Sequence, residues 1–139
     1  MLQEPITIIY MTDGVSSRQS NDVDIDNRKR MTVQVGQYLH AKQYQFDFPD
    51  NQMDQTPLLD VVKSIETVAQ DVTPDLVYTH HFADLNVDHR VVHQAVMTAF
   101  RPIPGKSIPS IYTFEVNSST EWNSPNNANS FIPNSFIDI

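Results

Sequence analysis

The side chains best suited to chemistry gather between residues 74 and 90 of this 139-residue chain. Histidines and aspartates occur there together, at His80, His81, His89, Asp75, Asp84 and Asp88. An apolar run ends at residue 78, and a new apolar periodicity begins after residue 89. Imidazoles and carboxylates are the side chains that bind zinc and that transfer protons near neutral pH. The stretch therefore predicts a metal site or an acid–base site between a strand and a helix.

The composition limits which sites and partners are open to the chain. There is no cysteine, so disulfides and thiolate metal sites are excluded, and a transition metal would need His and carboxylate ligands. The net charge of −8 argues against nucleic acid, because no basic stripe exists to neutralise phosphates. No segment approaches the roughly 20 apolar residues of a membrane span, and residues 1–13 do not resemble a signal peptide. We therefore expect a globular protein of the cytoplasm.

Strand-like and helix-like patterns alternate along the chain. Short runs rich in β-branched and aromatic residues predict strands over residues 6–11, 44–48, 75–79 and 110–116. Apolar residues three and four apart predict helices over residues 27–41, 58–68 and 88–100. Thr56 and Pro57 are the expected N-cap and first residue of the second helix. We expect polar loops up to residue 26 and over residues 117–134. This alternation predicts an α/β fold, a mainly parallel sheet with helices on both faces.

Ligands of parallel sheets bind outside the carboxyl ends of the strands. The loops expected at those ends are rich in polar groups, and they comprise residues 12–18, 49–51, 80–89 and 117–122. The cleft that these loops would share is therefore polar, and it suits a hydroxylated or charged small molecule.

Five segments, in order, resemble the motifs of one enzyme family. They are TDGVSSR at residues 12–18, FPDN at 48–51, THH at 79–81, DLNVDHR at 84–90 and SSTEW at 118–122. Together they resemble the PIG-L/LmbE-like zinc-dependent N-deacetylases, over nearly the whole chain from about residue 6. The resemblance implies a Rossmann-like fold and Zn²⁺ as the cofactor. It also implies hydrolysis of the acetyl group of an N-acetylated amino sugar, such as N-acetylglucosamine, or of its conjugate.

The resemblance also implies roles for single residues. In the family, zinc is held by a His and an Asp of an early Ala-His-Pro-Asp-Asp motif and by a later histidine, which corresponds to His89. The other aspartate of the early motif is the base for the zinc-bound water. Asp88 and His80 are the expected catalytic residues, although Asp88 could instead be a helix N-cap. In the family, a histidine at the position of Asn86 often donates the proton to the leaving amine. Asn86 cannot donate this proton, and His80 or His81 could do so instead.

Polar residues around the expected cleft are the substrate-binding candidates. They are Asp13, Arg18, Asn51, His81, Asn86, Glu121 and Trp122. The indole of Trp122 could cover a sugar ring, or it could anchor the loop. Asp13 and Asn51 could contact substrate or could equally well be ordinary turn residues. Asp84 is expected to be a loop residue that binds its own backbone. His93, one helical turn after His89, is expected to have a surface or packing role.

The early Ala-His-Pro-Asp-Asp motif does not occur in the 139 residues. The chain therefore lacks two metal ligands and the base that the family uses. We expect residues 1–139 to form a single partial domain, a fragment of a longer hydrolase that is inactive alone. The alternative is a non-catalytic α/β module that binds a sugar or a nucleotide sugar. A missing central strand would expose sheet edges, and homo-oligomers could then form.

Overall fold

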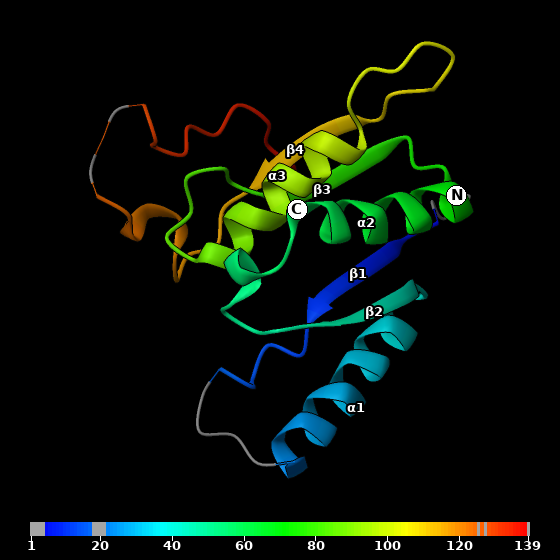
Figure 1. Ribbon diagram of the computed structural model, residues 1–139, viewed down its shortest axis with the longest axis vertical. Coiled ribbons are helices and arrows are strands. Elements are labelled where there is room, and N and C mark those ends of the chain that lie inside the picture. The colour runs from blue at the N-terminus through cyan, green and yellow to red at the C-terminus, as the bar shows by residue number, and fades with distance from the viewer. Residues whose placement is uncertain (1–4, 18–21, 125, 127, 139) are drawn as a thin grey trace. The chain divides into compact units, whose positions relative to one another are not determined.

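The computed structural model describes residues 5–17, 22–124, 126 and 128–138, and the chain divides into two compact units. The first unit is Met1–Thr73 and the second is Pro74–Ile139 (Figure 1). Each unit contains one pair of parallel strands joined through a helix. The predicted α/β class with parallel strand pairing is confirmed, whereas helices on both faces of one sheet stay a prediction.

The first unit begins with a strand, a helix and a strand. β1 (Thr7–Thr12) pairs in parallel with β2 (Lys42–Phe48), and α1 (Asp22–Leu39) lies between them in the chain. Parallel pairing requires such a crossover because the chain must return to the same end of the sheet. α1 runs alongside β2 (Figure 1). The helix begins earlier than the predicted residue 27, and carboxylates such as Asp24 and Asp26 favour a helix start because they complement its dipole.

α2 (Leu58–Val72) is the most amphipathic helix of the first unit, and it follows a short 3-10 helix, η1 (Met53–Gln55). Its buried residues recur at helical spacing, as predicted, at Val61, Val62, Ile65 and Val68. The prediction of Thr56 as the N-cap is wrong. The N-cap is Pro57, which makes no side-chain hydrogen bond, and Thr56 has extended backbone, as residues before proline usually do.

The second unit repeats the strand–helix–strand order. β3 (Leu76–His80) pairs in parallel with β4 (Ser110–Phe114), and α3 (Val87–Ala99) connects them and packs on β3. A further 3-10 helix, η2 (Thr120–Trp122), lies within the predicted loop after β4. His80 is the last residue of β3 and pairs with Phe114. The carboxyl end of β3 and the start of α3 therefore meet at the histidine-rich segment.

Candidate functional site

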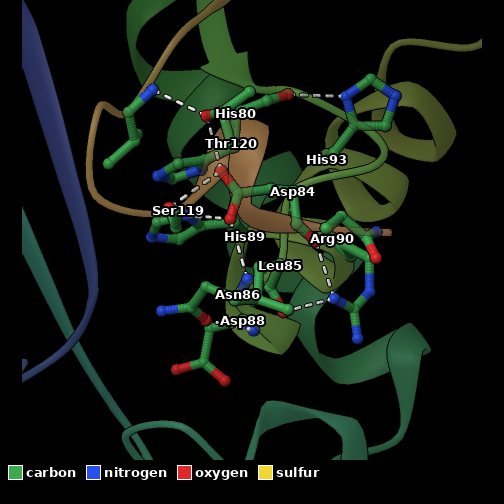
Figure 2. Close-up of polar contacts among 12 residues, drawn as sticks. His80, Asp84, Leu85, Asn86, Asp88, His89, Arg90, His93, Ser119 and Thr120 are labelled. Carbon is green, nitrogen blue, oxygen red and sulfur yellow. Dashed lines mark hydrogen bonds and ion pairs between the residues drawn. The ribbon is translucent and has the colours of Figure 1, made fainter. Parts of the chain in front are cut away.

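A buried aspartate, Asp84, lies at the centre of a hydrogen-bond network beyond the end of β3 (Figure 2). Its Oδ1 atom accepts a hydrogen bond from the backbone N–H of Asn86 at 2.8 Å and lies 3.1 Å from Nδ1 of His89. Its Oδ2 atom accepts hydrogen bonds from the hydroxyls of Ser119 at 3.1 Å and Thr120 at 2.8 Å. Asp84 therefore joins the start of α3 to the segment that contains η2.

The hydrogen bonds keep Asp84 ionised although it has no exposed surface. Burial raises the pKa of a carboxyl group, but donors on Asn86, Thr120, Ser119 and His89 outweigh it and lower the pKa of Asp84 below its ordinary value. A carboxylate can only accept hydrogen bonds, so Nδ1 of His89 must carry the shared proton. In the neutral ring, Nε2 of His89 then has a free lone pair.

His89 stands in the first turn of α3, and its side chain is 21% exposed. Within the described part of the chain its Nε2 atom makes no hydrogen bond. Histidines that bind metals usually donate their other ring N–H to a carboxylate or a carbonyl, which fixes the ring. The position of Asp84 gives His89 this arrangement. The role of His89 as a metal ligand nevertheless stays a prediction.

The His80 ring stacks on the His89 ring, with centroids 4.0 Å apart and planes 13° from parallel (Figure 2). The Phe114 ring also contacts His80, at a centroid distance of 4.9 Å. Burial, together with the neighbouring His89, lowers the pKa of His80 to about 4. A ring that stays unprotonated at pH 7 is poorly suited to protonate a leaving amine. The catalytic role of His80 stays a prediction.

Asn86, rather than Asp88, is the N-cap of α3. The Asn86 side chain accepts a hydrogen bond from the backbone N–H of Asp88 at 2.9 Å. The N-cap interpretation of Asp88 is therefore wrong. Asp88 is buried in the first turn, where a carboxylate complements the helix dipole. The predicted roles of Asp88 in catalysis and of Asn86 in substrate binding stay predictions.

The loop that carries Asp84 is held in place through its backbone. The Arg90 guanidinium donates to the carbonyl oxygens of Asp84 at 2.7 Å and Leu85 at 2.6 Å. The Leu85 N–H donates to the carbonyl oxygen of Ser119 at 3.2 Å. His93 lies with Nδ1 2.8 Å from the carbonyl oxygen at the end of β3, in agreement with the packing role expected for it. These backbone hydrogen bonds therefore fix the loop from which the Asp84 carboxylate extends.

His81 and Glu121 contact the C-terminal segment. Nε2 of the buried His81 lies 2.9 Å from the carbonyl oxygen of Asn129, and the Phe131 ring meets the His81 ring edge-on. Oε1 of Glu121 accepts the Phe131 N–H at 2.7 Å. Each side chain thus uses a polar atom within the chain, and the substrate-binding roles of both stay predictions. Trp122, at the end of η2, is 68% exposed.

Two further substrate-binding candidates lie in the first unit. Oδ1 of Asp13 accepts the N–H groups of Val15 and Ser16, both at 2.9 Å, which is the turn expected from its sequence. Asn51 has a positive φ of 57°, which is also typical of a turn. Arg18 lies outside the described residues.

The sequence did not indicate the central place of Asp84 or the role of Ser119 and Thr120. Asp84 does bind its own backbone as predicted, through the Asn86 N–H, but three other donors also reach it. The signal available in the sequence was the presence of two ordered motifs, DLNVDHR and SSTEW. Their contact spans 36 positions between Asp84 and Thr120, which local patterns do not reveal.

The described residues do not form a complete metal site. They contain no group of three or more His, Asp or Glu side chains that could hold an ion. A catalytic zinc usually has three protein ligands and one open position. His89 could supply one nitrogen, whereas the oxygens of Asp84 are already engaged by four donors.

A family model described as PIG-L, GlcNAc-PI de-N-acetylase, matches residues 2–100. The chain belongs to the PIG-L family. The matched model describes a family of de-N-acetylases, and members of the family are typically metal-dependent. The match includes α3 with His89 and ends before η2.

The fold is also similar to a solved structure, that of GalB, the 4-carboxy-2-hydroxymuconate hydratase from Pseudomonas putida KT2440. The TM-score is 0.60 at 20% sequence identity, and the match covers 81% of this chain and 54% of that one. The PIG-L chain thus spans about half the length of the hydratase, and the likeness concerns the fold alone. A search of curated proteins gave no match. None of the helices in the described residues combines the length and apolar character needed to cross a membrane.

Proposed function

We propose that this PIG-L chain is part of a zinc-dependent hydrolase that removes the acetyl group from an N-acetylated amino sugar or its conjugate. The observation that carries the proposal is the Asp84–His89 pair. A buried carboxylate engages Nδ1 of His89 at 3.1 Å and leaves Nε2 open beyond the carboxyl end of β3. The other metal ligands and the base would come from outside these 139 residues.

The proposed reaction adds one water across the amide bond and gives acetate and a free amine. A base must take a proton from the water, and an acid must supply one to the amine nitrogen as the C–N bond breaks. Zn²⁺, when bound, would polarise the acetyl carbonyl and make its bound water more acidic. Within the chain, His89 is the proposed ligand, Asp84 holds its ring, and Asp88 and His80 are the proposed catalytic neighbours.

The proposed substrate class is supported by the family and by the residues after β4. The family is described by its action on an N-acetylglucosamine conjugate. The exposed indole of Trp122 is able to cover one face of a sugar ring, and it lies next to Glu121 in η2. We keep His81, Asn86, Asp13, Asn51 and Arg18 as further proposed contacts of an amino sugar.

Acetate release from N-acetylated sugars tests the proposal. The natural protein that contains this chain is assayed with zinc on N-acetylglucosamine, its phosphatidylinositol conjugate and UDP-N-acetylglucosamine. We expect turnover of at least one substrate, and a loss of about 100-fold or more in His89→Ala, since even residues that only support a ligand change activity by 10–100-fold. The matched control is His40→Asn, which removes an exposed histidine from the other unit and should retain activity.

Two outcomes would contradict the proposal in different ways. Full turnover in His89→Ala would remove His89 from the site. Micromolar binding of a sugar with no acetate release from any substrate would favour the non-catalytic binding module. The genomic sequence upstream adds a further check, because an in-frame His-Pro-Asp-Asp segment would provide the ligands and base that the chain lacks.

A further inference from the structure

A directed series of hydrogen bonds runs from the backbone after β4 to the ring of His89. The Val116 N–H donates to Oγ1 of Thr120 at 2.7 Å, and the Thr120 hydroxyl donates to Oδ2 of Asp84 at 2.8 Å. Oδ1 of Asp84 then accepts from Nδ1 of His89 at 3.1 Å. The direction is fixed because a backbone N–H only donates and a carboxylate only accepts. The hydroxyl proton of Thr120 must therefore point to Asp84.

Ser119 reinforces the same carboxylate oxygen. Its hydroxyl donates to Oδ2 of Asp84 at 3.1 Å, and both Ser119 and Thr120 are buried, with exposures of 7% and 2%. A carboxylate offers about four acceptor directions, and the two hydroxyls and the Asn86 N–H occupy three of them. The direction that remains faces Nδ1 of His89. The two hydroxyls thus fix how Asp84 meets the ring.

We propose that Thr120 and Ser119 are positioning residues that act through Asp84 to keep the proton of His89 on Nδ1 and its Nε2 lone pair open. This inference rests on the proposed function, in which His89 takes up a ligand through Nε2. It assigns a role to the SSTEW segment that differs from substrate contact, because both hydroxyls are buried and donate to Asp84. Oγ of Ser119 also lies 3.5 Å from Nδ1 of His89, on the same side of the ring as Asp84.

The side-chain effect can be separated from the backbone contacts of the same segment. The N–H groups of Ser119 and Thr120 both bind the carbonyl oxygen of Val116 at 2.9 Å, and the Ser119 carbonyl accepts the Leu85 N–H. These contacts do not use the hydroxyls. Thr120→Val removes the donor to Asp84, and also the acceptor of the Val116 N–H, with little change in shape, whereas Thr120→Ser keeps both.

The test is the tautomer of His89 in the full 139-residue chain, read from the ¹⁵N chemical shifts of Nδ1 and Nε2 at neutral to slightly alkaline pH. In the wild type we expect the proton on Nδ1. Asp84→Asn can present an amide N–H to the ring and should reverse the preference, as amide replacement of a histidine-orienting carboxylate does elsewhere. Thr120→Val should lower the Nδ1–H to Nε2–H ratio, because a carboxylate that has lost its Thr120 donor is no longer held facing Nδ1.

Two variants make the result specific. Thr120→Ser should restore the wild-type ratio, and Ser119→Ala should lower it less than Thr120→Val because the Ser119 bond is longer. Thr67→Val is the matched control, because it removes a hydroxyl that donates to Lys63 on the exposed side of α2, and it should leave the His89 shifts unchanged.

A wild-type His89 with its proton on Nε2 would overturn the inference. So would unchanged His89 shifts in folded Asp84→Asn and Thr120→Val, or a Thr120→Ser variant that behaves like Thr120→Val. If Thr120→Val does not fold, Ser119→Ala and Asp84→Asn decide by the same criterion. The measurement needs neither metal nor substrate, so its failure is distinct from a failure to release acetate.

Discussion

At the scale of single residues, a carboxylate with no exposed surface is stable only where donors replace the water it has lost. Asp84 meets this condition through two hydroxyls, one backbone N–H and one imidazole N–H. In turn, Asp84 is the acceptor that these four donors share. Its removal should therefore destabilise the second unit.

Asp84→Ala is therefore expected to destabilise the fold by about 2–4 kcal/mol, because buried donors are left without an acceptor. Urea denaturation at pH 7 measures the change. The comparison is Asp71→Ala, which removes an exposed carboxylate paired with Lys42, and an exposed ion pair contributes little. Equal losses in the two variants would contradict the central place of Asp84.

His80 gives the fold a distinct pH dependence. Its pKa is about 4 in the folded chain and 6.5 for an ordinary histidine, so the unfolded chain binds more protons between these values. The contribution of His80 to the free energy of unfolding should be fully present above pH 6.5 and should decrease as the pH drops toward 4. The total decrease should be on the order of 3 kcal/mol. Because the pKa of Asp84 is lowered in the folded chain, protonation of Asp84 should reduce stability only below pH 3.8, the ordinary pKa of an aspartate.

Urea denaturation at steps between pH 7.5 and 4.5 measures this slope without involving Asp84. His80→Phe keeps an aromatic ring against His89 and Phe114 but cannot take up a proton. The variant should therefore show a shallower slope than the wild type over that range. A wild-type slope in His80→Phe would mean that another group carries the pH dependence.

At the scale of elements, the start of α3 sets the orientation of the site. Asn86 caps the helix through the Asp88 N–H, and His89 follows within the first turn. Asn86→Ala should cost about 1 kcal/mol of stability, the usual loss when a capping side chain is removed. Asn86→Asp keeps a capping oxygen and should lie close to the wild type in the same denaturation experiment. If both variants lose equally, the Asn86 side chain acts in some way other than capping.

α1 contacts β2 at Gly36, a residue type with low helix propensity. A Cβ atom at Gly36 would lie 2.2 Å from the Gln43 side chain, whose Nε2 donates to the carbonyl oxygen of Thr32 at 2.7 Å. Gly36→Ala should gain helix propensity but lose that bond, so the net change should be small. In a Gln43→Ala background it should stabilise by about 0.5–1 kcal/mol. Thermal denaturation of the single and double variants measures this, and a destabilised double variant would contradict it.

The elements themselves were largely predictable from the sequence, because hydrophobic period is a local signal. The strands and helices formed near the predicted places, and the errors were at ends such as Asp22 and Thr56. The site was predictable only in part. His80 and His89 were singled out by residue type, but their stacking depends on packing between β3 and α3. Asp84 meets Thr120 across 36 positions, and no local pattern carries that contact.

At the scale of the whole molecule, the chemistry-bearing residues divide unevenly between the two units. The aspartate network, the stacked histidines and η2 all belong to Pro74–Ile139, whereas Asp13 and Asn51 belong to Met1–Thr73. The described residues orient His89 through Asp84, but they contain no group of three metal ligands. The proposed reaction would therefore need ligands beyond these residues, although Asp84 already orients His89.

The 139-residue chain with added zinc should accordingly release no more acetate than zinc alone, because a catalytic zinc needs about three protein ligands. Calorimetric titration with zinc should likewise give no tight site, and His89→Ala should change neither result. Turnover by the chain that disappears in His89→Ala would reverse this conclusion. It would mean that the missing ligands come from residues outside the described ones or from a second copy of the chain. Sedimentation measurements across the active concentration range would separate these sources, because only the second requires activity to rise with self-association.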